Sequence, residues 1–100
     1  MTTIRVGLPS HLQALAGVAH EVQVDVPDRP TIQDLLDALE MAHPALRGTI
    51  REQVTGTRRP FMRYHACGED LSHQLPSDRL PDAVIDGSEP FAIVGAISGG

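Results

Sequence analysis

The stretch EPFAIVGAISGG, residues 89–100, decides the fold. From Glu89 to Ile97 both alternating sets of positions are apolar or small, which is typical of a strand that is covered on both faces or flanked by strands on both edges. We therefore predict that these residues form the central strand of a sheet. The Asp86-Gly87 pair before them predicts the turn that leads into this strand.

Two shorter runs near the start of the chain predict a hairpin. Apolar residues alternate with others over residues 4–8, where Pro9 ends the run, and again over residues 22–26. The connection contains HLQALAG, residues 11–17, which predicts either a short turn of helix closed by Gly17 or a loop with apolar anchors. So short a connection favours antiparallel pairing of the two strands.

One amphipathic helix follows the hairpin. Thr31 stands three residues before Asp34, which is a variant of the capping box found at helix starts. Pro44 ends the element, because the residue before a proline is pushed out of the helical region. The apolar positions in between recur at the spacing of one helix face. They are Ile32, Leu35, Leu36, Leu39 and Ala42.

The remaining segments are shorter. Residues 45–60 lose the periodicity, which indicates a long loop with a turn of helix near Ile50. Residues 61–67 alternate again and predict a strand that the CGED turn ends. Proline-punctuated pieces then run to Ser88, and their expected core anchors are Leu75, Leu80, Ala83 and Val84. The sum is a single α+β domain in which one sheet packs against one main helix.

Composition restricts the kinds of function. The net charge is −5, yet the window from Arg47 to Arg63 holds five arginines opposed only by Glu52 and carries +4. All eight basic residues are arginine, so the chain has no lysine side chain that could accept an isopeptide bond. Cys67 is the single cysteine, which excludes an internal disulfide. With no secretory signal and no apolar stretch near the ~20 residues of a membrane span, we expect a cytoplasmic protein that does not enter membranes.

Together these elements resemble a known family. A hairpin, a capped helix ending in HP, the turns CGEDL and IDGSEP, and a final strand ending in Gly-Gly resemble the β-grasp, ubiquitin-like sulfur-carrier proteins of the ThiS and MoaD type. The most specific element is GAISGG, residues 95–100, supported by residues 31–46 and 86–97. The resemblance implies a mixed-sheet β-grasp domain over residues 1–97, with the C-terminal strand central, and a flexible tail over residues 98–100.

The resemblance also implies a chemistry. In such carriers a ubiquitin-activating-like enzyme adenylates the C-terminal carboxylate with ATP, and a sulfur donor protein then leaves a thiocarboxylate that a downstream synthase accepts. Gly100 would carry the reactive group here, and Gly99 and Ser98 would enter the partner's narrow channel, where side chains could obstruct. The chain would bind no cofactor itself and would not be an enzyme. Cysteine, thiamin, molybdopterin and specialised metabolites all remain possible destinations of the sulfur.

A docking surface is expected next to the tail. Ile97 and Ala96 would form its apolar part, and Arg58, Arg59 and Arg63 its charged rim, since charge patches steer partners. A solvated loop with scattered arginines is the competing interpretation. Many relatives have an Asn-Gly turn where this sequence has Cys67-Gly68, and the chain is longer than typical members, so the sulfur acceptor stays open.

Other classes of function have less support in the sequence. His65, Cys67 and His73 do not supply the four ligands of a zinc site or an oriented catalytic pair, so we expect neither a metal nor an intrinsic active site. Negative charge and only three aromatic residues argue against nucleic-acid binding. The stronger rivals are a ubiquitin-like modifier conjugated to other proteins, and a β-grasp module that only binds partners.

Overall fold

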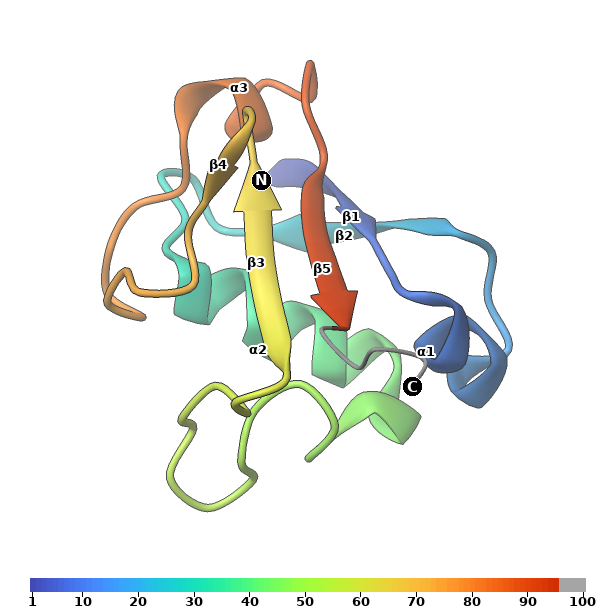
Figure 1. The fold of residues 1–100 in the computed structure, drawn as a ribbon. Helices are drawn as coiled ribbons and strands as arrows, with labels where there is room; N and C mark the ends of the chain where they lie inside the picture. Colours follow the sequence, from blue (N-terminus) through green and yellow to red (C-terminus); the bar gives the residue numbers. More distant parts are fainter. Residues whose placement is uncertain (96–100) are drawn as a thin grey trace.

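The computed structural model describes residues 1–95 (Figure 1). Five strands form one sheet in the order β2-β1-β5-β3-β4, which places the last strand in the middle. The strands are β1 (Thr2–Gly7), β2 (Glu21–Val26), β3 (Met62–Ala66), β4 (Glu69–Asp70) and β5 (Phe91–Gly95). The helices are α1 (Ser10–Ala16), α2 (Ile32–Ala42), the 3₁₀ helix η1 (Pro44–Leu46) and α3 (Asp82–Ile85).

The sheet is mixed. β5 runs parallel to β1 and antiparallel to β3, while β1 with β2 and β3 with β4 are antiparallel pairs. The predicted hairpin and the central position of the last strand are therefore confirmed, and the α+β fold with one sheet and one main helix is confirmed with them. Residues 96–100 lie outside the described part, and with them the predicted tail and the end of the 1–97 domain.

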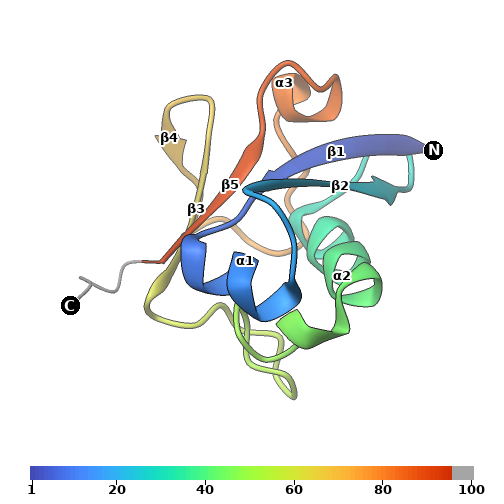
Figure 2. The ribbon, with the colours of Figure 1, turned by 90° about the vertical axis from the view of Figure 1, so that its right-hand side faces the viewer.

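The main helix α2 begins where the capping box predicts. The Thr31 hydroxyl accepts from the Asp34 amide at 3.1 Å, and the Asp34 carboxylate accepts from the Thr31 amide at 3.0 Å. The helix ends at Ala42, two residues before Pro44, as expected from the sterics of proline. Figures 1 and 2 show α2 lying across one face of the sheet. Its buried residues are Ile32, Leu35, Leu36 and Leu39.

The core lies between α2 and that face of the sheet. Alternate residues of each long strand point into it, and the rings of Tyr64 and Phe91 pack there with their centroids 5.4 Å apart. The opposite face of the sheet is open, because Val94 of β5 is 41 % exposed. Of the two alternatives that the double apolar pattern allowed, the structure therefore has the second: β5 is flanked by strands on both edges.

The long irregular segments hold the other differences. The helical turn after α2 is η1 at Pro44–Leu46, because Pro44 starts a new turn, and it does not lie around Ile50. Leu75 was expected in the core but is 64 % exposed, and Ala83 is only half-buried, whereas Leu80 and Val84 are buried as predicted. Neither β4 nor α3 was predicted. Across residues 1–95, every helix is too short or too polar to cross a membrane.

Candidate docking site at the end of the last strand

The described part of β5 ends beside α1. Ala92 is the register partner of Gly7, the last residue of β1, so β5 runs three residues past that strand. On its other edge β5 stays paired, with Gly95 opposite Met62. The chain leaves β1 through Leu8 and Pro9 into α1, and this turn takes the place of β1 beside the end of β5.

Gly95 permits a close approach between β5 and α1. A Cβ atom on Gly95 would lie 2.9 Å from Cε1 of His11, closer than real Cβ contacts come. The His11 ring, itself exposed, therefore covers the backbone of the last described residue. A glycine at this position has a packing reason as well as a conformational one.

A groove of about 670 Å³ runs along this junction. The turn from Gly7 to His11 forms one wall, and the end of β5 from Ala92 to Gly95 forms the other. His20, Glu21 and Pro90 complete the lining. The lining of the groove is mainly apolar, so an apolar side chain of a partner could enter it beside β5.

The open face of β5 is apolar and lies between two ion pairs. Arg5 donates to Glu21 at 2.8 Å on the β1–β2 side. On the β3–β4 side Arg63, the register partner of Val94, pairs with Asp70. This arrangement leaves a strip with no net charge beside charged flanks, which suits an interface with an apolar centre and a polar rim.

The ion pairs shift their carboxyl groups toward the charged state. Hydrogen bonding from Arg5 lowers the pKa of Glu21, and the same contact raises the pKa of Arg5. Hydrogen bonds from Ser72 first, and from Arg63 second, hold the pKa of Asp70 well below its usual range. Arg5 and both carboxyl groups are therefore ionised near pH 7.

Phe61 adds a second exposed apolar group near this edge. It precedes Met62, the partner of Gly95, and is 65 % exposed. Phe61, Val94 and the groove together form what we call the tail-exit surface. The periodicity of the sequence did not distinguish it, because the same apolar residues also fit a buried strand; the closest signal was the small residue Gly95 next to the tail.

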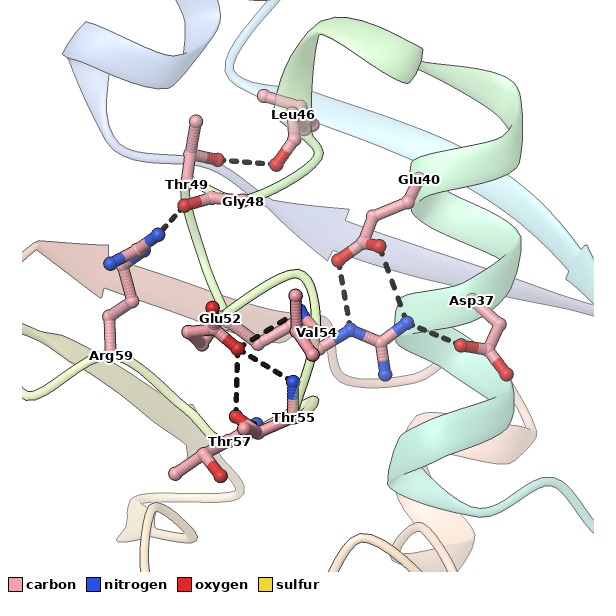
Figure 3. Close-up of polar contacts among 11 residues, drawn as sticks. Asp37, Glu40, Leu46, Gly48, Thr49, Glu52, Val54, Thr55, Thr57 and Arg59 are labelled. Carbon is pink, nitrogen blue, oxygen red and sulfur yellow. Dashed lines mark hydrogen bonds and ion pairs between the residues drawn. The ribbon is translucent and has the colours of Figure 1, made fainter.

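The arginine window has a structural role that the charge count did not predict. Arg51 binds the Asp37 and Glu40 carboxylates of α2, with Nε 2.9 Å from Glu40 (Figure 3). Arg59 donates to the Gly48 carbonyl in the same loop. Arg58 donates to the carbonyl oxygens of Ser72, Arg59 and Met62. Arg51 and Arg58 fasten the loop of residues 47–60 to the rest of the fold, and Arg59 joins two parts of the loop to each other.

The predicted site residues thus fall into two groups. Gly100, Gly99, Ser98, Ile97 and Ala96 lie outside the described residues. Of the three arginines expected at the rim, Arg63 lies next to Val94 on the tail-exit surface, whereas Arg58 and Arg59 lie in the loop. The roles given to all eight remain predictions.

The residues weighed as metal ligands do not come together. Within residues 1–95, no group of three His, Cys, Asp or Glu side chains is placed to hold a metal ion. Cys67 is exposed in the turn after β3, and His65 is half-buried on that strand.

Fold and surface together define a class. A five-stranded mixed sheet with a central last strand, one covering helix and an apolar surface beside the end of that strand is the architecture of a small ubiquitin-like β-grasp protein. No family model matches the sequence, and no curated protein matches it in sequence.

Solved structures do match, over nearly the whole chain. SAMP1 from Haloferax volcanii has a TM-score of 0.76 and 28 % identity, covering 98 % of this chain and 99 % of that one. A chain of the Amycolatopsis orientalis BexX/CysO complex has a TM-score of 0.73 and 18 % identity, and the match covers 96 % of this chain and 98 % of that one. CysO of Mycobacterium tuberculosis has a TM-score of 0.71 and 17 % identity, and the match covers 93 % of this chain and 98 % of that one.

These neighbours are β-grasp small proteins of the sulfur-carrier and ubiquitin-like, ThiS/MoaD type. The resemblance seen in the sequence is confirmed at this level, and these neighbours are small carrier and modifier proteins.

Proposed function

We propose that this chain is a cytoplasmic sulfur carrier whose reactive group is the carboxylate of Gly100. A carboxylate oxygen attacks the α-phosphate of ATP in a ubiquitin-activating-like partner and releases pyrophosphate. Hydrosulfide released by a donor protein then attacks the acyl carbon and displaces AMP, which leaves a thiocarboxylate with no change of oxidation state. A downstream synthase takes the sulfur for a biosynthetic product. The chain binds no cofactor or metal of its own, and ATP belongs to the partner.

One observation carries the proposal. The described part of the central strand ends at Gly95, five residues before Gly100, and the strand is held on both edges. A strand held on both edges, in a chain whose last two residues are Gly99 and Gly100, fits a substrate group that must reach into another protein's closed site. The full-length similarity to carrier and modifier proteins supports the same interpretation.

The tail-exit surface would supply the binding energy for the activating partner. Apolar residues at the centre of an interface contribute most of the affinity, and flanking charges mainly affect association rate and orientation. In this proposal Val94, Phe61 and the groove contact the partner, together with Ile97 and Ala96. Arg63 takes the rim role, and Arg58 and Arg59 contribute charge from the loop.

Conjugation to proteins is the second candidate, and the name of one neighbour favours it, since H. volcanii SAMP1 is called a small archaeal modifier protein. The two functions share the acyl-adenylate and differ in the next nucleophile, which is sulfur in one case and an amine in the other. A β-grasp module that only binds partners needs neither the acyl-adenylate nor the attack of a nucleophile on it.

Mass spectrometry of the C-terminal peptide tests the proposal. The protein is incubated with ATP, a sulfur source and a candidate activating enzyme, and then digested with trypsin to release residues 80–100. Replacing oxygen by sulfur adds about 16 Da, nominally as much as one oxidation, but this peptide contains neither Met nor Cys. A gain of that mass supports the carrier. No gain, with an enzyme shown to be active on this chain, rejects it, and cross-linking to a lysine of another protein then supports the modifier.

Two variants distinguish the chemical role of the C-terminal carboxylate from the binding role of the tail-exit surface. One extra residue after Gly100 should abolish both sulfur transfer and conjugation but leave simple partner binding unchanged. Val94→Asp should weaken the activating step at least tenfold through KM, because it places a charge at the centre of the proposed interface. Val54→Asp is the matched control, since Val54 is exposed in the 47–60 loop, and it should behave like the wild type.

A further inference from the structure

A second pocket lies on the other side of the fold from the open sheet face. It has a volume of about 290 Å³ and is enclosed by α2, β3, the end of the 47–60 loop and the segment around Ser72. No residue lines both this pocket and the groove at the tail-exit surface. The side chains that matter below are Ile32, Leu36, Arg51, Arg58 and Tyr64.

Tyr64 brings a hydroxyl group to this pocket. The residue is only 5 % exposed, and within residues 1–95 its hydroxyl makes no hydrogen bond, although its backbone amide donates to Ser72 Oγ at 2.8 Å. The hydroxyl oxygen is not among the fully buried polar atoms, so it is open to the pocket and available to a ligand there.

Arg51 and Arg58 line the same pocket as Tyr64. Arg51 uses Nε and Nη2 for Asp37 and Glu40, so its charge is balanced, and its Nη1 has no partner among residues 1–95. Arg58 uses Nε and Nη1 for backbone carbonyls, has no carboxylate partner in the described chain, and keeps Nη2 free. The positive charge of Arg58 is therefore not balanced by a carboxylate partner among residues 1–95.

Burial and three neighbouring charges act on the Tyr64 hydroxyl. Burial raises the pKa of Tyr64 to about 12, while the charges of Arg51 and then Arg58 act in the opposite direction and that of Glu40 adds to the rise. The hydroxyl therefore stays protonated at neutral pH and can donate a hydrogen bond.

We propose that this pocket binds a small organic carboxylate. Arg58, Arg51 and the Tyr64 hydroxyl would donate to the anionic end, and Ile32 and Leu36, both buried on α2, would contact an apolar body. The volume is at the lower end of the range for small-molecule sites. The binding does not depend on any chemistry at Gly100, so it stands apart from the carrier function.

A pair of matched probes tests the proposal on the whole protein. Cyclohexanecarboxylate and its neutral isostere cyclohexanecarboxamide are titrated at pH 7 by calorimetry and by tyrosine emission. Tyr64 is the only tyrosine and there is no tryptophan, so the emission reports this pocket alone. We expect saturable binding of the carboxylate with a change in emission, and at least tenfold weaker binding of the amide. No saturable binding, or equal binding of both probes, overturns the proposal.

Variants add an independent check. Arg58→Gln removes the uncompensated charge and should weaken carboxylate binding at least tenfold, and Tyr64→Phe should weaken it several-fold while keeping the ring. Arg59→Gln, an exposed neighbour that does not line the pocket, should bind like the wild type. If Arg59→Gln weakens binding as much as Arg58→Gln, general charge attraction explains the data and the pocket is rejected. Should Arg58→Gln fail to fold, the comparison of the two probes on the wild type still decides.

Discussion

Cys67 sits in a backbone conformation that its side chain opposes. It is the first residue of the two-residue turn between β3 and β4, where Ala66 pairs with Glu69, and its φ is 55° while that of Gly68 is 75°. Two positive φ values define the hairpin turn in which Asn-Gly is strongly preferred. An ordinary residue in this region costs about 1–2 kcal/mol, and asparagine tolerates it best after glycine.

Cys67→Asn should therefore stabilise the protein. The Cys67 side chain is exposed, so little packing is lost, and we expect a gain of about 0.5–1 kcal/mol in the free energy of unfolding. For a domain of this size that corresponds to a rise in Tm of roughly 3–6 °C. Cys67→Val, with a β-branched side chain, should lose about 1 kcal/mol, and Cys67→Gly should lie between Asn and Val because the flexible unfolded chain offsets the relief.

Urea unfolding followed by circular dichroism, in the presence of a reductant, measures the series. The slope m should be the same in all four proteins, so that differences in midpoint report stability. An order other than Asn, Gly, Val from most to least stable, or an Asn variant no more stable than the wild type, would refute the assignment of strain to this turn.

Three further predictions concern the helix cap, the loop and the ion pairs. Thr31→Ala should lower the free energy of unfolding by about 1 kcal/mol, since it removes the cap of α2, and Thr31→Ser should restore most of it in the same urea assay. Arg51→Gln should cost about 1–2 kcal/mol and speed thermolysin cleavage of the 47–60 loop, because two carboxylates of α2 lose their partner; an unchanged cleavage rate would contradict this role. The depressed pKa of Asp70 stabilises the fold above the carboxyl's ordinary pKa of 3.8, and this stability is lost as the pH falls through the folded-state value. Arg63→Gln should consequently raise the acid-unfolding midpoint, measured by circular dichroism, and an unshifted midpoint would count against the pair.

Local rules predicted the local elements well. The capping box at Thr31, the apolar stripe of α2 and the alternation in β1, β2 and β3 each depend on residues a few positions apart. They were confirmed, except that Ala42, the last residue of the predicted stripe, is exposed. The central place of β5 followed from its apolar pattern on both sets of positions.

Long-range partners could not be read from the sequence. Leu75 is as apolar as any core residue, but its segment is held by turns and hydrogen bonds that leave it facing out. Nothing near Arg51 in the sequence indicates that it binds α2, eleven or more residues earlier. The tail-exit surface was missed in part for the same reason, since the contact of His11 with Gly95 joins opposite ends of the chain.

The parallel pairing of β1 with β5 also has a mechanical consequence. A force that pulls the end of β5 and the start of β1 in opposite directions acts along both strands, so the hydrogen bonds between them are loaded together in shear and not opened one after another. On its other edge β5 is held by β3, which resists the same displacement. A partner that pulls on β5 from its C-terminal end would therefore meet a stiff anchor.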